Sequence, residues 1–433
     1  MQIEPAQQLE GEIEVPGDKS ISHRYGILGA MATGQSSITG FSTSKDCWST
    51  LACVEQLGCS VRRAGDDVEI ESDGWRKIKS PEQPLDAGNS GTTIRLLSAL
   101  LSSTSISTTI AGDESLNQRP MARIVEPLTR MGARIVARDG RFPPLAIDGT
   151  PLSPISYELP VASAQVKSCV LLAGLTASGK TTVIENTQSR DHTERVLPVF
   201  GVRFEKDGTE LSVWGPSEPR GTLVHVPGDI SSAIYFIVAA LLIPGSQLRI
   251  NKLGVNPTRS GLLTLLRNSG AQIRLENRRE VSSEPWADVT VRYDASFLET
   301  FPKRIEGSWI PNLIDEIPIL AVLGTRLKNG LQIRDAAELR HKESDRIQSI
   351  VQNLGALGIE VEEIPDGFDI PPGQGLRGGT ISTFGDHRIA MSFAIAGLIS
   401  RDGIEIDEPT CADISFPGFF DLLSRVSRTA SPS

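Results

Sequence analysis

The segment Gly88–Ile110 reads GNSGTTIRLLSALLSSTSISTTI. It begins with small polar residues, continues as a run rich in Leu and Ala, and ends, after a Ser-rich turn, in alternating Thr and Ile. A small polar residue before an apolar run marks a helix start, and β-branched residues favour a strand. The segment therefore predicts a helix followed directly by a strand.

The same order of residue types occurs in five further segments, which begin at Gly17, Ala162, Gly228, Ile314 and Gly385. A second, more polar helical run follows most copies and closes with Gly and a short strand, as in LGCSV, MGARIV, FGVRF, SGAQI and LGIEV. Gly just past a helix end readily takes the left-handed conformation of a C-cap. The chain thus reads as six copies of a βαβαβ-like unit of roughly 70 residues, with the last copy truncated.

The tetrapeptide Val-Pro-Gly-Asp occurs twice, at 15–18 and 226–229, each time after a strand-like run and before a repeat. We interpret these as the points where the chain crosses between two domains. Residues 18–228, with copies one to three, form an inserted domain. Residues 1–17 and 229–433, with copies four to six and an N-terminal strand, form a discontinuous one.

Composition narrows the class of function. The 433 residues carry a net charge of −10, which argues against nucleic acid or an anionic membrane as partner. The longest apolar run, near Ala233–Pro244, is too short to span a bilayer, and the N-terminus lacks the pattern of a signal peptide. Five scattered cysteines without a CxxC pair and five single histidines predict reduced thiols, a cytoplasmic location and no protein-ligated metal.

The starts of the repeat helices predict anion binding. Capping residues lie at or near these starts, namely Ser20, Ser90, Ser163, Ser231, Asp315 and Asp386. Helix N-termini present free N–H groups and partial positive charge. Taken singly, an Arg near a helix start is more often a solvated surface residue. Here polar and basic side chains recur at equivalent places in the repeats, which favours a site for carboxylate and phosphate groups.

One motif points elsewhere. Residues 174–181, GLTASGKT, match the GxxxxGK[ST] pattern of nucleotide-binding loops. Such a loop leaves a strand and opens a helix, whereas here the preceding run reads as helix and the following TTVIEN as strand. We therefore predict that this segment is not a nucleotide site.

Seven motifs in order resemble those of the 5-enolpyruvylshikimate-3-phosphate synthase family, from about Gly11 to Phe420. They are PGDKSISHR, GNSGTTIR, QRPM, SRDH, IDEIP, HKESDR and GDHRIAM. The resemblance implies an α/β (α+β) fold of two similar domains, each of three βαβαββ repeats, arranged as an inside-out α/β barrel with the active site in the interdomain cleft. It also implies chemistry that needs no cofactor or metal. We expect a monomer, although the sequence does not give the oligomeric state.

The implied reaction transfers the enolpyruvyl group of phosphoenolpyruvate to shikimate 3-phosphate, a step toward chorismate and the aromatic amino acids. By position in the matching motifs, the residues expected to bind shikimate 3-phosphate are Lys19, Ser20, Arg24, Ser163, Gln165, Ser189, Asp315 and Lys342. Those expected to bind phosphoenolpyruvate are Lys19, Gly91, Arg119, Gln165, Arg346 and Arg388, with Asn89 in the same loop as Gly91.

The chemistry requires both an acid and a base, since a hydroxyl loses a proton, a methylene carbon gains one, and the carbon later loses one. Asp315, Glu343 and Lys342 supply such a set, and Lys19 is expected between the two substrates. Asp315 would orient or deprotonate the shikimate 5-hydroxyl. Whether Glu343 or Lys342 protonates carbon stays open.

Two positions depart from one branch of the family. Ala164 stands where many members have a second Ser, and Ile414 where one branch has a Lys. Both substitutions occur in the other branch, so they bear on the closing contacts rather than on the reaction. The sister transferase acting on UDP-N-acetylglucosamine is the nearest alternative, but it uses a loop Cys that the QRPM loop lacks. Gly91 leaves room where a larger residue could obstruct phosphoenolpyruvate analogues, so inhibition by glyphosate is a hypothesis that depends on the geometry of the neighbouring loops.

Overall fold

Six small β-sheets account for the six predicted repeats in the computed structural model, which describes residues 1–429. The chain divides into two units. The inserted unit comprises Gly17–Pro227 and Glu280–Glu284, and the terminal unit comprises Met1–Pro16, Gly228–Arg279 and the chain from Pro285 onward. Each Val-Pro-Gly-Asp segment spans one of the boundaries.

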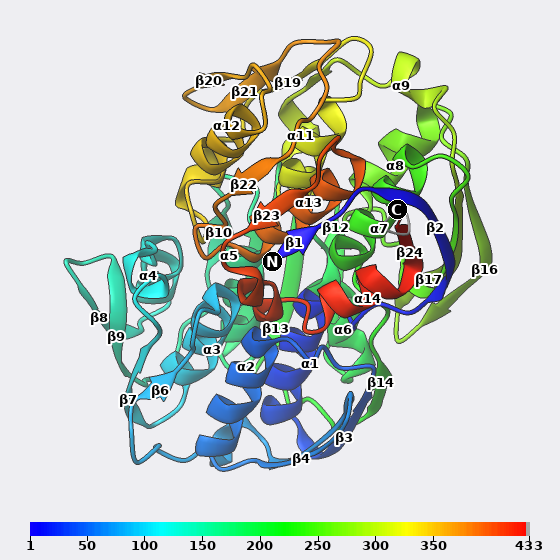
Figure 1. Ribbon diagram of the computed structural model, residues 1–433. Coiled ribbons are helices and arrows are strands. Elements are labelled where there is room, and N and C mark those ends of the chain that lie inside the picture. The colour runs from blue at the N-terminus through cyan, green and yellow to red at the C-terminus, as the bar shows by residue number, and fades with distance from the viewer. Residues whose placement is uncertain (430–433) are drawn as a thin grey trace. The chain divides into compact units, whose positions relative to one another are not determined.

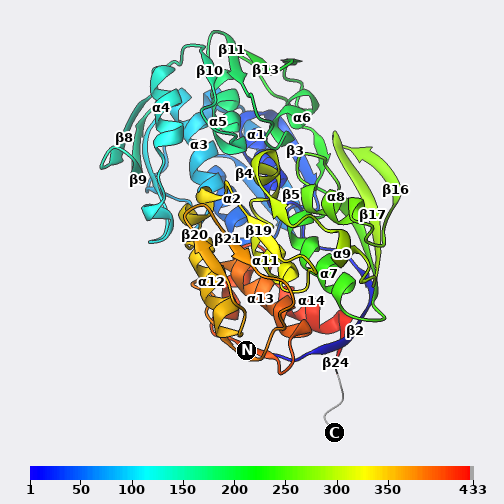
Figure 2. The same cartoon turned by 90° about the horizontal axis from the view of Figure 1, so that it is seen from above.

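The short segment Glu280–Glu284 was predicted to lie in the terminal domain, but it belongs to the inserted unit. It is the tip of the hairpin formed by β16 (Ile273–Val281) and β17 (Glu284–Arg292), which is visible in Figure 2. The Ser282 carbonyl accepts a hydrogen bond from the Tyr25 hydroxyl at 3.3 Å, and Glu284 pairs with the His192 ring at 2.7 Å. A boundary drawn from turn residues alone does not detect such a long-range contact.

The inserted unit contains three four-stranded sheets of identical order: first, second, fourth and third strand of the repeat. The first sheet is β14 (Leu223–His225), β3 (Thr33–Thr39), β5 (Asp67–Asp73) and β4 (Ser60–Ala64). The second is β6 (Leu85–Asp86), β7 (Ser107–Ala111), β9 (Phe142–Asp148) and β8 (Arg134–Arg138), drawn in cyan in Figure 1. The third is β10 (Ser156–Glu158), β11 (Gly179–Ile184), β13 (Glu210–Gly215) and β12 (Phe204–Asp207). In each sheet the first two strands are parallel and the other pairs antiparallel.

Each sheet of this unit is joined to one buried and one partly exposed helix. The buried helices are α1 (Lys19–Met31), α3 (Gly91–Ser103) and α5 (Ala164–Gly174). The others are α2 (Lys45–Gln56), α4 (Ala122–Arg130) and α6 (His192–Val199). The buried helices are enclosed around most of their circumference, which is why their sequences lack an amphipathic period.

The terminal unit repeats this plan, with strands borrowed from the chain ends. One sheet runs β16, β17, β15 (Gln247–Gly254), β2 (Ala6–Ile13) and β24 (Ser427–Thr429). The next runs β18 (Arg304–Ile305), β19 (Leu331–Ile333), β21 (Gly367–Ile370) and β20 (Glu362–Ile364). The last runs β1 (Gln2–Ile3), β23 (Ile404–Ile406) and β22 (Gly379–Ile381).

Three buried helices pack against one another within this unit, α7 (Ile230–Leu242), α11 (Ile317–Gly324) and α13 (His387–Ile399). More peripheral are α8 (Gly261–Asn268), α12 (Arg346–Ala356) and α14 (Phe419–Val426). Short helices α9 (Phe297–Thr300) and α10 (Ile310–Leu313) lie in the connections.

The predicted repeat is confirmed, with one correction at the N-terminus. That segment was expected to form one strand, but it forms β1 and β2 in two different sheets. Strand β2 pairs in parallel with β15, as the first strand of copy four, and β1 pairs with β23 of the truncated copy six. Likewise β14, late in the inserted unit, supplies the first strand of copy one.

The helix-ending glycines behave as predicted. All five have positive φ, namely Gly58 at 96°, Gly132 at 101°, Gly201 at 74°, Gly270 at 91° and Gly358 at 81°. Ser90, Ser163 and Asp386 are the N-caps of their helices. The other three predicted residues, Ser20, Ser231 and Asp315, lie one or two positions from the N-caps Asp18, Asp229 and Glu316 of α1, α7 and α11. In α1 and α7 the Asp of Val-Pro-Gly-Asp accepts the first free N–H groups.

Candidate functional site

Three helix starts in the inserted unit carry most of the predicted residues, and local capping explains why each helix begins there. Asp18 accepts the Ile21 N–H at 2.9 Å, Ser90 the Thr93 N–H at 3.1 Å, and Ser163 the Val166 N–H at 3.4 Å. The resulting α1, α3 and α5 pack side by side, α3 between the other two. The polar residues at their first turns are thereby brought to one region of the unit.

Lys19 begins α1 and points toward α2. Its Nζ lies 2.8 Å from Oδ2 of Asp46, which is buried in the first turn of α2. The Asp46 carbonyl in turn accepts a hydrogen bond from Thr93 of α3 at 3.4 Å. The ammonium is therefore held near the starts of both α1 and α3, with some of its surface exposed.

Arg24 lies one turn after Ser20 and is buried. Its guanidinium donates to the Ser20 carbonyl at 2.7 Å, to the Thr193 hydroxyl at 2.7 Å and to the Ser168 hydroxyl at 2.8 Å. Burial lowers the pKa of Arg24 to about 10, since Glu194 and Asp18 compensate only part of the cost. At neutral pH the side chain is a cation held by three neutral oxygen atoms.

Arg119 and the loop before α3 form the next group. The Arg119 guanidinium donates to Oδ1 of Asn89 at 2.7 Å, to the Asn89 carbonyl at 3.3 Å and to Ser115 at 3.0 Å. A Cβ added at Gly91 would lie 3.9 Å from Arg119 Nη1 and 2.7 Å from Arg95 Nη1. Gly91 therefore lies against both guanidinium groups, and any side chain there would displace Arg95.

Gln165 joins α5 to α3. Its Oε1 accepts from Arg95 at 2.7 Å and its Nε2 donates to Thr92 at 3.0 Å. These two bonds fix the amide orientation of a side chain expected to contact both substrates. Arg95 lies within the GNSGTTIR motif, but the family resemblance assigned it no role. The structure shows that it is the partner that holds Gln165.

Ser189 follows β11 and is buried. Its N–H donates to Oε1 of Glu185 at 3.0 Å, and its hydroxyl bonds to the same oxygen. The other Glu185 oxygen lies 2.9 Å from Nζ of Lys167. The hydroxyl must leave Glu185 in order to donate to a phosphate oxygen.

The terminal unit gathers a second group of predicted residues around Asp315. Arg346 Nη1 lies 3.6 Å from Asp315 Oδ1, and Arg388 Nη2 lies 3.7 Å from Asp315 Oδ2. Arg346 also pairs with Glu343 at 2.6 Å and with Asp386 at 2.8 Å. Two buried cations thus flank the Asp315 carboxylate, and two further carboxylates, those of Glu343 and Asp386, pair with Arg346.

The charges in this group stabilise one another. Burial alone would lower the pKa values of Arg346 and Arg388, but the neighbouring carboxylates, Asp386 for Arg346 and Asp315 for Arg388, raise both above their ordinary value. Burial would raise the pKa of Asp386, but Arg346 outweighs this and lowers it. Both guanidinium groups and Asp386 are therefore charged at neutral pH.

Lys342 lies apart from the arginines. Its Nζ is 3.0 Å from Glu338, and the side chain is 22% exposed against 1% for Arg346. It immediately precedes Glu343 in a turn before α12. The ammonium is accessible to a ligand, whereas Arg346 is fixed by its partners.

The inserted unit holds Lys19, Arg24, Arg119, Gln165 and Ser189, and the terminal unit holds Asp315, Lys342, Glu343, Arg346 and Arg388. Within each unit the structure also adds partners that no motif assigned. In the inserted unit, Asp46 pairs with Lys19. In the terminal unit, the buried Arg259 lies 2.8 Å from Glu316, the residue that follows Asp315. Arg259 lies outside every quoted motif, so the sequence carried no signal for it.

The two departures from the family pattern lie at element ends. Ala164 is the first residue of α5, directly after the cap Ser163, and is half-buried. Ile414 ends the short 3₁₀ helix Pro409–Ile414 and is also half-buried. Neither supplies a polar side chain at its position.

The GLTASGKT segment has the predicted order of helix and strand. Helix α5 ends at Gly174 and strand β11 begins at Gly179, so the segment joins a helix to a strand. Lys180 is exposed and lies over the Trp214 ring at 5.5 Å. The geometry of a phosphate-binding loop before a helix is absent from this segment.

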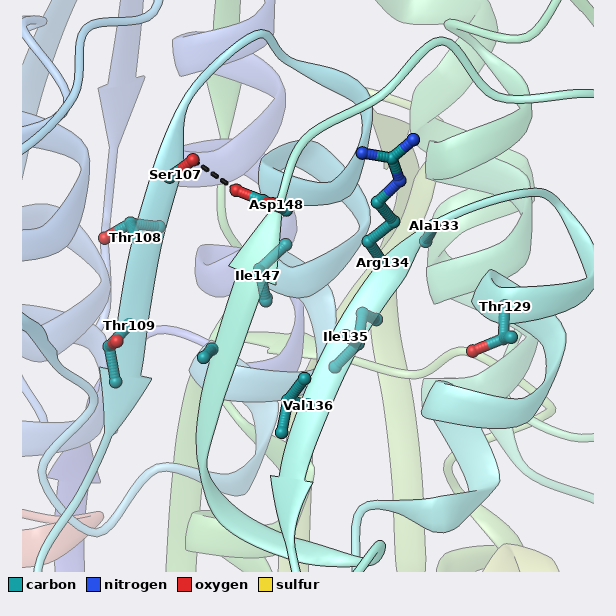
Figure 3. A pocket seen from close by; sticks show the side chains of 11 residues that line it. Ser107, Thr108, Thr109, Thr129, Ala133, Arg134, Ile135, Val136, Ile147 and Asp148 are labelled. Carbon is teal, nitrogen blue, oxygen red and sulfur yellow. Dashed lines mark hydrogen bonds between the residues drawn. The ribbon is translucent and has the colours of Figure 1, made fainter.

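A cavity of about 630 Å³ lies on the second sheet, on strands β7, β8 and β9. Figure 3 shows the side chains that line it, among them Arg134 and Val136, and the hydrogen bond from Ser107 to Asp148. Its lining contains one cation and one carboxylate and none of the predicted residues. A ligand with both a carboxylate and a phosphate needs more positive charge than a single Arg134 in the same lining as Asp148 provides.

Residues 1–429 contain no helix that is long and apolar enough to cross a bilayer. The same described residues contain no group of three or more His, Cys, Asp or Glu side chains placed to hold a metal ion.

Comparison with known proteins gives a consistent result. The family described as EPSP synthase (3-phosphoshikimate 1-carboxyvinyltransferase) matches residues 3–423. The 3-phosphoshikimate 1-carboxyvinyltransferase of Brevibacillus brevis is 45% identical over 99% of this chain and 100% of the relative. That of Gloeobacter violaceus is 48% identical over 98% of each chain.

Solved structures agree. EPSP synthase from Acinetobacter baumannii superimposes with a TM-score of 0.86 at 39% identity, covering 99% of this chain and 98% of that one. The enolpyruvyl transferase NikO from Streptomyces tendae has a TM-score of 0.79 at 18% identity, with coverage of 98% and 96%. The second likeness concerns the fold alone.

Proposed function

The chain belongs to the 3-phosphoshikimate 1-carboxyvinyltransferase (EPSP synthase) family, and from this premise we propose how its residues perform the reaction. The enzyme transfers the enolpyruvyl group of phosphoenolpyruvate to the 5-hydroxyl of shikimate 3-phosphate and releases phosphate. The reaction belongs to the shikimate pathway to aromatic amino acids. The assignment of roles to residues is the proposal.

Shikimate 3-phosphate binds to Lys19, Ser20, Arg24, Ser163, Gln165, Ser189, Asp315 and Lys342. Its phosphate group lies at the loops of Ser163 and Ser189. The burial of Arg24 among neutral oxygen atoms supports its part, because its charge is left to attract an anion. Lys342 is accessible and can reach a ligand without breaking a buried ion pair.

Phosphoenolpyruvate binds to Lys19, Gly91, Arg119, Gln165, Arg346 and Arg388. Gly91 lets a small anion approach the guanidinium of Arg119 without a side chain in between. Arg346 and Arg388 are buried and fixed by carboxylates, so they present their remaining N–H groups in defined directions. A planar carboxylate or phosphate is matched by such groups.

Asp315 is the base in the addition step. It takes the proton of the 5-hydroxyl as that oxygen bonds to the central carbon of phosphoenolpyruvate, while Glu343 or Lys342 protonates the methylene carbon. In the elimination step the C–O bond to phosphate breaks, and the methyl carbon returns a proton to restore the double bond. Lys19 offsets negative charge between the two substrates.

The observation that carries this proposal is the cluster of Asp315, Glu343 and two buried arginines, in which acid–base groups and anion-binding groups are in contact. The test is phosphate release with both substrates, measured for wild type, Asp315→Asn, Glu343→Gln and Lys342→Met. Asp315→Asn should lower kcat by about 10²- to 10⁴-fold, the usual contribution of a general base. Unchanged single-turnover formation and breakdown of the intermediate in Glu343→Gln or Lys342→Met removes that residue from the mechanism.

We further propose that the inserted and terminal units are separate domains that both contribute to this reaction, and that the enzyme is a cytoplasmic monomer. All five cysteines are buried and unpaired, which supports a reducing compartment. Sedimentation equilibrium at micromolar concentration tests the oligomeric state, and a dimer would contradict it.

A further inference from the structure

Lys167 connects the two loops assigned to the phosphate group of shikimate 3-phosphate. It lies one turn after the cap Ser163, and its N–H donates to the Ser163 carbonyl at 3.0 Å. Its Nζ lies 2.9 Å from Oε2 of Glu185. The other oxygen of Glu185 accepts the Ser189 N–H at 3.0 Å and bonds to the Ser189 hydroxyl.

The same ammonium reaches a second carboxylate, Oε1 of Glu194 in the first turn of α6, at 2.7 Å. Lys167 is fully buried, and Glu185, Ser189 and Glu194 are each 7% exposed. Burial raises the pKa of Glu194, although Lys167 opposes this effect. One ammonium thus pairs with two buried carboxylates, of which Glu194 also interacts with the charge of Arg24. Burying these charges is costly unless the arrangement has a use.

The position of Glu185 suggests that use. When Ser189 turns its hydroxyl toward a phosphate, Glu185 loses a donor and presents negative charge close to a dianion. Lys167 offsets that charge from behind and keeps Glu185 in place. Without Lys167, the same carboxylate would repel the phosphate through a region of low dielectric.

We propose that Lys167 is a positioning residue for the phosphate group of shikimate 3-phosphate, acting through Glu185 on Ser189. The proposal rests on the proposed assignment of Ser163 and Ser189 to that phosphate. It concerns the phosphate alone, so shikimate itself, which lacks the phosphate, is the matched ligand.

The experiment is isothermal titration of the full-length protein with shikimate 3-phosphate and, separately, with shikimate. Lys167→Met should weaken binding of shikimate 3-phosphate by about 10- to 100-fold, the range for a charge-assisted contact. Binding of shikimate should change by less than about twofold. Lys180→Met is the control, because Lys180 is exposed on the neighbouring strand β11 and contacts Trp214.

Two double variants separate the proposal from a general loss of stability. The first combines Lys167→Met with Glu185→Gln and retains the carboxylate of Glu194. The second combines Lys167→Met with Glu194→Gln and retains the carboxylate of Glu185, which faces Ser189. The first should recover most of the affinity for shikimate 3-phosphate, and the second should not. They also replace the single variant if it fails to fold, as judged by near-ultraviolet circular dichroism.

Equal affinity of the two double variants for shikimate 3-phosphate would overturn the proposal, as would equal losses for both ligands in Lys167→Met. Ser163→Ala and Ser189→Ala test the premise. If neither weakens binding of shikimate 3-phosphate, the assignment of the phosphate site fails. If both weaken it and Lys167→Met does not, the role of Lys167 alone is wrong.

Discussion

The two units hold their predicted arginines with different kinds of partner. In the inserted unit, Arg24 donates to a carbonyl and two hydroxyls, and Arg119 donates to Asn89 and Ser115. In the terminal unit, Arg346 is bound to Asp386 and Glu343, and Arg388 lies next to Asp315.

The difference appears in the pKa values. Burial lowers that of Arg24 to about 10, whereas carboxylates raise those of Arg346 and Arg388 despite burial. A guanidinium among neutral oxygen atoms keeps its charge for a ligand. A guanidinium among carboxylates is fixed in direction by its ion pairs. In the inserted unit these arginines therefore donate to neutral oxygen atoms, whereas in the terminal unit they lie against carboxylates.

The largest effect should follow from Arg346→Met. This change leaves Asp386 and Glu343 without their buried cation, so the free energy of unfolding should fall by about 3–5 kcal/mol. Urea unfolding measures it. Arg62→Met is the control, because Arg62 is exposed and lies 3.8 Å from Glu69, and no measurable loss is expected there. A second Asp386→Asn change should recover part of the loss, and no recovery would refute the charge argument.

Arg24→Met should affect ligand binding more than stability. The Ser168 and Thr193 hydroxyls already lie 2.6 Å apart and can bond to each other, so the stability loss should be smaller than for Arg346→Met. Affinity for shikimate 3-phosphate should fall by about 10- to 100-fold, measured by titration calorimetry. If Arg24→Met were the more destabilising change, the comparison between the units would be wrong.

Gly91→Ala sharpens the comparison inside the inserted unit. The added Cβ would lie 2.7 Å from Arg95, which holds Gln165, so Arg95 must move. We expect KM for phosphoenolpyruvate to rise about tenfold, equivalent to about 1.4 kcal/mol, and glyphosate inhibition to weaken. Steady-state kinetics with an inhibitor series measures both. Gly355→Ala in α12 is the control, since no atom lies within 4 Å of its added Cβ, and it should leave both values unchanged.

The smallest effect is the pH dependence of the free energy of unfolding. Its slope should have opposite signs for the carboxyl groups of the two units. The lowered pKa of Asp386 means that its ionised form stabilises the folded protein at pH values above 3.8, its ordinary pKa. This stabilisation is lost as the pH falls through the lower pKa that Asp386 has in the folded protein. The raised pKa of Glu194 means that stability falls as pH rises from its ordinary value of 4.5 through the folded one.

Urea unfolding between pH 3 and pH 8 resolves these two contributions. Asp386→Asn should flatten the acid side of the stability profile, and Glu194→Gln should flatten the decline above about pH 4.5. Identical profiles for wild type and both variants would contradict the assigned directions.

Much of the fold followed from local signals in the sequence. Capping residues such as Ser90 and Ser163, apolar runs and helix-ending glycines such as Gly132 define each helix and strand, because these signals act within a few residues. Six repetitions then indicated the repeat. The motifs also located Asp315, Arg346 and Arg388 in advance, and the structure places these three in one cluster.

The tertiary structure alone decided which distant partners complete each repeat and hold each charge. Strands β1 and β14 pair far from their neighbours in the chain, and the hairpin tip Glu280–Glu284 belongs to the inserted unit. The partners of Lys19 and Lys167, Asp46 and Glu185, follow no fixed spacing. Pairing of strands and buried charges depends on distance in space, and a sequence pattern encodes only distance along the chain.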